Sequence, residues 1–223
     1  MLDKTKTDPL LGQEVEQYLK SLGVHTPTVD EESSIEGDKE IIEKAFTDIM
    51  KVLKLDLMDD SLRDTPRRMA KMYTNEIMWG LSTQNFPKIT VVENKMQYDE
   101  MVLEKNIKVN SLCEHHFVSI WGKAHVAYIP KDRVLGLSKL NRIVEYFCRR
   151  PQIQERLGQQ IFHALEYVLK TDDIAVVIEA EHFCVKSRGV EDVNSNTITS
   201  KLGGRFMSNP NLRNEFMSLL KSK

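Results

Sequence analysis

Two short stretches of the sequence concentrate residues that bind metals or transfer protons. The first, SLCEHHFVSI, contains Cys113, His115 and His116, and the second, EHFCVKSRG, contains His182 and Cys184. Together they hold two of the three cysteines and three of the six histidines in the chain. Thiolate sulfur and imidazole nitrogen are ligands that zinc prefers. The two stretches therefore predict a zinc site with ligands from two distant parts of the chain.

The spacing of these residues leaves two kinds of zinc site open. Cys113 and His116 are three positions apart, so a turn or bulge is needed for both to reach one metal. The apolar alternation that precedes His182 and Cys184 predicts that both lie on one face of a strand. With Cys113, His116 and Cys184 as ligands, a fourth position stays free for water or substrate, whereas His182 as a fourth ligand would close a structural site.

Residues beside the ligands could take part in chemistry at an open site. Two thiolates largely neutralise a zinc ion, so a neighbouring base would help its bound water to react. His115 and His182 are the candidates for that base. Glu114 is either an exposed acid or a group that orients an imidazole.

Cations stand at the start of two predicted helices, where the helix dipole favours acids. Thr65-Pro66 is followed by Arg67, Arg68 and Lys71, and Ser138 is followed by Lys139 and Arg142. Arg188 adds positive charge after the second Cys/His stretch. This placement favours an anionic ligand, such as a polyphosphate, over an ordinary solvated surface. In QIQERL, Glu155 is either solvent-facing or an acceptor for adjacent N–H groups of a ligand.

Composition limits the partners and the compartment. The chain has 223 residues, a net charge of -2 and no apolar run long enough to cross a membrane, so neither nucleic acid nor membrane is an expected partner. Three cysteines do not make a disulfide framework, and a reducing cytosol is the expected location. Residues 1–36 are rich in polar residues and predict a loosely attached arm with one short amphipathic helix.

The remaining patterns predict an α+β fold. Residues 37–98 form a helical region, in which Ile42, Phe46, Ile49 and Leu53 recur at helix spacing. Residues 99–223 begin with extended segments between 101 and 130, continue with two helices from Ser138 and Pro151, return to strands at 173–187 and 196–206, and end in a helix after Pro210. Strands, a helix pair and further strands predict a sheet with helices on one face.

Four stretches resemble the zinc-dependent GTP cyclohydrolase I family: CEHHF, YIPKDRVLGLSKLNRIVEYF, RPQIQERL and EHFCVKSRGV. They occur in the family's order, and the resemblance extends from about Glu40 to the final helix. It implies the tunnelling fold, an antiparallel sheet of two hairpins with a helix pair on one face, preceded here by N-terminal helices. It also implies a homo-oligomer, a decamer built of two pentamers, with active sites at subunit interfaces.

The resemblance implies hydrolytic opening of the guanine imidazole ring of GTP to formate and 7,8-dihydroneopterin triphosphate, the first step of folate and pterin synthesis. Under it, Cys113, His116 and Cys184 hold Zn²⁺, whose water attacks C8, while His182 is a catalytic group and not a fourth ligand. The other expected roles are proton transfer for His115 and His182, and contacts to the guanine edge for Gln154 and Glu155. Ribose and triphosphate are expected to contact Ser138, Lys139, Arg142 and Arg188, while Arg68 and Lys71 would reach a phosphate across a subunit boundary.

Two other functions fit parts of the pattern. A binding module would use a closed Cys2His2 zinc site only to hold its hairpins together. A related tunnelling-fold enzyme would act on a different pterin or purine, and would not need the basic clusters unless its substrate carried a polyphosphate. The motifs do not distinguish the folate pathway from tetrahydrobiopterin synthesis.

Overall fold

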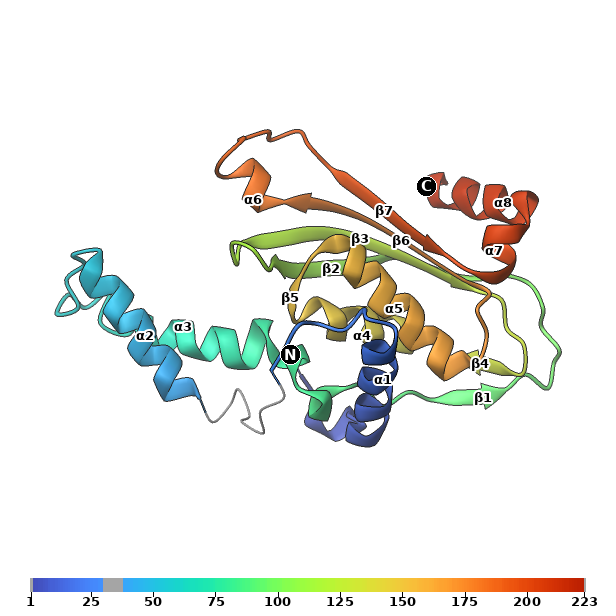
Figure 1. The fold of residues 1–223 in the computed structure, drawn as a ribbon, viewed down its shortest axis with the longest axis horizontal. Coiled ribbons are helices and arrows are strands. Elements are labelled where there is room, and N and C mark those ends of the chain that lie inside the picture. The colour runs from blue at the N-terminus through green and yellow to red at the C-terminus, as the bar shows by residue number, and fades with distance from the viewer. Residues whose placement is uncertain (1, 30–37, 223) are drawn as a thin grey trace.

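A five-stranded sheet forms the centre of the molecule (Figure 1), in a computed structural model that describes residues 2–29 and 38–222. The strand order is β5-β2-β3-β6-β7, with β2 and β3 as one hairpin, β6 and β7 as a second antiparallel pair, and β5 parallel to β2. The strands are β2 Val102–Cys113, β3 Ser119–Tyr128, β5 Pro151–Gln152, β6 Ile174–His182 and β7 Thr197–Leu202. The expected α+β sheet of two hairpins is confirmed.

Two helices cover one face of this sheet. They are α4 Leu137–Cys148 and α5 Gln154–Leu169. Leu140 and Phe147 of α4 and Ile161 of α5 are fully buried with strand residues such as Ile178 in the main hydrophobic core. The predicted helix pair is therefore present, although α5 begins three residues after Pro151, because Pro151 and Gln152 first pair with the end of β2.

A second, smaller core lies on the opposite face, which the sequence did not predict. After β7 the chain forms α7 Gly204–Ser208 and α8 Pro210–Lys221. Phe206 and Phe216 pack there with Val177, with ring centroids of the two phenylalanines 5.6 Å apart. Side chains of alternate residues on β3 and β6 thus enter different cores, and the sheet is buried on both faces at this end.

The N-terminal helix α1, Pro9–Ser21, is part of the main core. The prediction of a loosely attached arm was therefore wrong for the described residues 2–29. Val15 and Leu19 are buried, and the Tyr18 hydroxyl donates to Glu166 of α5 over 2.8 Å. The Arg150 guanidinium, buried after α4, lies 3.1 Å from the Glu16 carboxylate. The last residues of the predicted arm, 30–36, lie outside the described residues.

The first part of the predicted helical region, with α2 Lys39–Val52 and α3 Thr65–Lys71, extends away from the sheet (Figure 1), whereas Trp79 and Phe86 of the same region lie in the main core. Asp64 is the N-cap of α3, and a π-helical segment, η2 Met72–Ile77, follows this helix. Short segments complete the chain: η1 Lys4–Lys6, η3 Trp79–Leu81, η4 Thr83–Asn85, and the pair β1 Val91–Glu93 and β4 Arg133–Leu135. Ile49 and Leu53, part of the predicted apolar stripe, are 51% and 64% exposed, so this stripe lacks a complete partner among residues 2–29 and 38–222.

No helix within the described ranges is long and apolar enough to cross a membrane.

Candidate metal centre and active site

The turn between β2 and β3 brings the first pair of candidate ligands together. Cys113 is the last residue of β2, and the chain turns through residues 114–116 before β3 begins. Phe117 adopts a left-handed φ of 52°, and its N–H donates to the Cys113 carbonyl over 2.8 Å. As a result the Cys113 Sγ and His116 Nδ1 atoms are 3.9 Å apart. The turn that the ligand spacing required is confirmed.

The second stretch reaches the same place by a different geometry from the expected one. β6 ends at His182, and Phe183–Lys186 form one helical turn, α6. The prediction that His182 and Cys184 share one face of a strand was therefore wrong, because the chain leaves the extended conformation after His182. The helical turn nevertheless directs Cys184 toward Cys113, since ligand atoms of Cys113, His116 and Cys184 all lie within 4.8 Å of one another.

These three side chains fit a zinc ion. Ligand atoms of a tetrahedral zinc site with sulfur and nitrogen ligands are separated by roughly 3.5 to 4 Å, close to the Cys113–His116 separation. Burial and the neighbouring Cys113 raise the pKa of the Cys184 thiol, so metal binding there must release a proton. His182 is not in the group of possible ligands found among the described residues, and this disfavours a closed Cys2His2 site.

His182 is held instead by Gln154, the first residue of α5. The His182 Nε2 and Gln154 Oε1 atoms are 2.7 Å apart, and Gln154 Nε2 donates to the Ile178 and Thr197 carbonyls and to the Thr199 hydroxyl. Because Oε1 of Gln154 accepts, His182 must donate from Nε2, which leaves its Nδ1 as the free acceptor. Burial lowers the pKa of His182, which favours its neutral form.

An ion pair that sequence analysis missed lies beside the ligand turn. The Arg156 guanidinium of α5 contacts the Glu114 carboxylate, which sits between the two ligands of the turn. Glu114 Oε1 is also 3.9 Å from Nε2 of His115, so Glu114 is not simply an exposed acid. An arginine in the first turn of a helix was the available signal, since that position ordinarily favours acids.

Three of the expected phosphate-binding cations lie at the same end of the sheet. Arg188 Nη1 is 2.7 Å from Nε2 of His116. Arg68 and Lys71 are exposed on α3, which borders the pocket described next, and Arg68 donates to the Ser61 carbonyl and the Thr65 hydroxyl. Glu155 is exposed at the start of α5, between the residues that hold His182 and Glu114.

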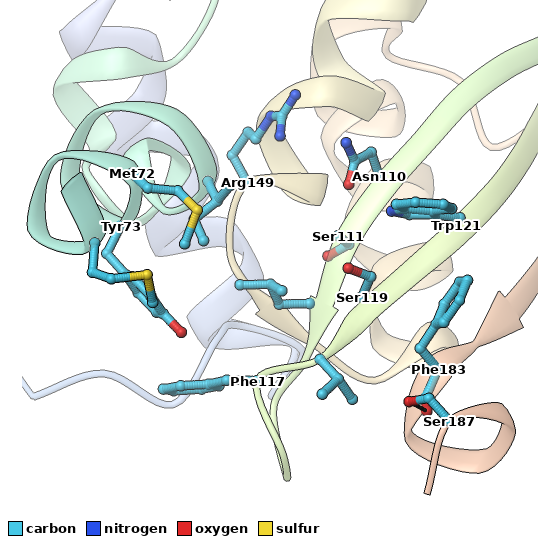
Figure 2. Close-up of a pocket in the computed structure, with 14 residues that line it drawn as sticks. Met72, Tyr73, Asn110, Ser111, Phe117, Ser119, Trp121, Arg149, Phe183 and Ser187 are labelled. Carbon is cyan, nitrogen blue, oxygen red and sulfur yellow. Dashed lines mark hydrogen bonds between the residues drawn. The ribbon is translucent and has the colours of Figure 1, made fainter. Parts of the chain in front are cut away.

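A pocket of 480 Å³ separates α3 and η2 from the β2–β3 hairpin. Figure 2 shows Met72 and Tyr73 on the helical side, and Phe117, Trp121 and Phe183 on the side of the sheet. Phe117 follows the ligand His116, and Phe183 precedes the ligand Cys184. The pocket therefore adjoins the metal centre, and its walls are mostly apolar and aromatic.

The structure does not bring Ser138, Lys139 and Arg142 to this centre within one chain. They lie in the first turns of α4, whereas Arg149, just beyond the end of α4, is one of the residues that line the pocket. At 1.5 Å per residue, Ser138 lies roughly 16 Å from Arg149, measured along the helix axis. Arg142 instead lines a separate hollow with Asp3 and Lys6.

Comparisons with known proteins agree with this site. Residues 42–221 match the family model described as GTP cyclohydrolase I. The chain is 56% identical over 206 residues to GTP cyclohydrolase 1 of Vibrio vulnificus strain YJ016, covering 92% of this chain and 95% of the relative. It is 55% identical over 203 residues to GTP cyclohydrolase 1 of Yersinia enterocolitica, covering 91% and 92%. The chain belongs to the GTP cyclohydrolase I family.

Proposed function

We propose that this protein hydrolyses the imidazole ring of GTP, releases formate and forms 7,8-dihydroneopterin triphosphate. Its family and the shared name of its Vibrio and Yersinia relatives support this reaction. The observation that carries the proposal is the grouping of Cys113, His116 and Cys184 while His182 is held apart by Gln154. Three protein ligands and a separate base are what an open, hydrolytic metal site requires.

Cys113, His116 and Cys184 would hold the zinc ion, which supplies an activated water for attack at C8 of guanine. His182 accepts a proton at Nδ1, the ring nitrogen left free by the hydrogen bond to Gln154, and returns it to the departing nitrogen. His115, which is exposed on the ligand turn, serves the later proton transfers at the sugar. Burial of His182 supports this role because a base must be neutral before it accepts a proton.

Glu155 recognises the guanine edge. Its exposed carboxylate stands at the start of α5 and can accept from the adjacent N1–H and N2–H groups of the base. Gln154 has protein partners for both its side-chain nitrogen and its oxygen, so a guanine contact by Gln154 would have to replace one of them. The base contact is therefore assigned chiefly to Glu155.

The triphosphate is bound by cations from more than one subunit. Arg188 comes from the same chain as the metal ligands, whereas Ser138, Lys139 and Arg142 come from a neighbouring copy, since they are remote from the centre within one chain. Arg68 and Lys71 reach a phosphate across a subunit boundary. Ser138 contacts the ribose during its rearrangement.

The protein forms a homo-oligomer, a decamer of two pentamers. The exposed residues Ile41, Ile49 and Val52 on α2 support this assembly, because a helix face of this kind is ordinarily covered by a partner. In the part of the chain that the structure describes, the outer strand β7 also has an unpaired edge, where another sheet can add. The two cysteine ligands must stay reduced, which favours the cytosol as the location.

The direct test is incubation of the zinc-loaded protein with GTP, with detection of formate and of a fluorescent pterin after oxidation. Guanosine serves as the comparison substrate. Formate from GTP, with little or none from guanosine, supports the proposal. Equal rates with both would contradict the role of the cations, and intact GTP would contradict the reaction.

A further inference from the structure

The first turn of α5 connects the two halves of the metal centre. Gln154 holds His182, which is two residues before the ligand Cys184. Two positions after Gln154, Arg156 holds Glu114, which directly follows the ligand Cys113. One helical turn therefore contacts both segments that supply ligands, although these segments are about seventy residues apart in the chain.

The ligand turn has few other contacts that fix its position. One backbone hydrogen bond closes it, from Cys113 N–H to the Val118 carbonyl over 2.8 Å, and a second, from Glu114 N–H to the Gln152 carbonyl over 3.0 Å, ties it to β5. The side chains of His115 and His116 are exposed, and the 2.7 Å contact of His116 Nε2 with Arg188 Nη1 joins the turn to the second ligand stretch, not to α5. The contact between Arg156 and Glu114 is therefore a side-chain link between this turn and α5.

The ion pair between Arg156 and Glu114 is expected to contribute little to the free energy of unfolding. Arg156 and Glu114 are 12% and 24% exposed, so both charges lose much of their hydration. The Arg156 Nε atom is also buried without a hydrogen-bond partner among the described residues. Replacing such a pair with apolar side chains is often neutral or stabilising. A role in geometry explains the pair better than a role in folding.

We propose that Arg156 is a positioning residue for the reaction. Through Glu114 it fixes the Cys113–His116 turn against the first turn of α5, which also carries Glu155. This sets the distance between the metal and a guanine base held by Glu155. The role in turnover rests on the proposed function, whereas the role in ligand geometry does not.

The experiment compares Arg156→Met and Arg156→Lys with Arg205→Met. Arg205 forms an ion pair with the buried Asp173 over 3.2 Å, beside the start of β6 and therefore about 27 Å along the strand from His182. Each purified protein is titrated with zinc against a chelator of known affinity. The unfolding temperature of the metal-free protein, kcat and KM for GTP are measured in parallel.

The expected result for Arg156→Met is a loss of zinc affinity of about 10- to 100-fold, the usual effect of removing a group that orients a ligand. At saturating zinc, kcat falls more than KM changes, because the base still binds but the reacting atom is displaced. Arg156→Lys recovers part of both losses. Arg205→Met lowers the unfolding temperature and leaves zinc affinity and kcat unchanged.

Zinc affinity and kcat within twofold of wild type in Arg156→Met would overturn the proposal, as would equal losses in Arg205→Met. If Arg156→Met does not fold, Glu114→Gln keeps the shape and removes the charge, and the same zinc titration decides. A wild-type protein that binds zinc but leaves GTP intact would refute the proposed function, while the zinc titration would still test the role of Arg156.

Discussion

His182 and Gln154 are joined by a 2.7 Å hydrogen bond that selects the tautomer of the imidazole. Gln154 can do this because its Nε2 already donates to Ile178, Thr197 and Thr199, which fixes the direction of its amide. The arrangement keeps Nδ1 of His182 available as a proton acceptor. It resembles the general pattern in which a third group orients a base.

Removal of this partner should weaken turnover without loss of metal. In Gln154→Ala the His182 ring loses its orientation but keeps its base, so we expect kcat to fall by about 10- to 100-fold, less than the roughly 10²- to 10⁴-fold contribution of a general base itself. Zinc content, measured by atomic absorption, should stay near one per chain. Thr199→Val is the matched control, because it removes only one of three acceptors of the Gln154 amide. A Gln154→Ala protein with normal kcat would show that the tautomer is set by another group.

His182→Ala tests the open metal site directly. Because His182 is outside the group of possible ligands, the variant should retain zinc and its fold while formate release from GTP is abolished. His116→Ala is the matched comparison, since it removes a ligand and should lose zinc. Loss of zinc and unfolding in His182→Ala would instead support the closed structural site.

The metal ligands could be found from the sequence because their chemistry constrains the backbone. Cys113 and His116 cannot reach one metal from a flat strand, and the turn with Phe117 in a left-handed conformation satisfies that constraint. At Cys184 the predicted strand conformation was wrong. The apolar alternation of β6 ends at Ala180, and nothing in the alternation before it showed that the chain would form α6 after His182.

Packing between distant segments was much harder to predict. The spacing of Val15 and Leu19 predicted an amphipathic helix, but no pattern in the sequence indicated that its apolar face packs against α5. The segment was therefore predicted to be loosely attached. Arg156 was overlooked for a similar reason. Its partner Glu114 is 42 positions away, and only the fold brings the two charges together.

Acid should destabilise the fold partly through His125, a buried residue of β3. Burial lowers its pKa below the ordinary value of 6.5, against an opposing effect of Glu179 and a small reinforcing effect of Lys123 and Lys105. The unfolded chain therefore takes up a proton at His125 more readily than the folded protein does. This penalty is absent well above pH 6.5 and grows as the pH falls toward the pKa of the folded state.

His125→Gln should reduce this pH dependence, since glutamine has no proton to gain and can still accept the Asn106 N–H bond, 3.4 Å in the wild type. The measurement is the unfolding temperature of both proteins at about pH 7.5 and about pH 5.5. The loss on acidification should be smaller in the variant. An equal or larger loss would show that other groups dominate the titration.

The most direct test of the shared active site mixes two defective chains. Cys113→Ala lacks a metal ligand, and Lys139→Ala lacks a cation on α4, so each protein alone should have little activity. If Lys139 acts on the metal centre of a neighbouring copy, co-expressed chains form some sites in which both residues are intact. Random mixing in equal amounts makes about one quarter of the sites whole, and activity should recover toward that fraction.

The control is co-expression of Cys113→Ala with His116→Ala. Cys113 and His116 are ligands of one centre and come from the same turn of the same chain, so no mixture of these variants restores a complete site. Native mass spectrometry confirms that mixed oligomers have formed. Recovery in the first mixture and none in the second requires that a site takes its metal ligands from one chain and Lys139 from another. Mixed oligomers without recovery in either would place Lys139 outside the active site of its neighbour.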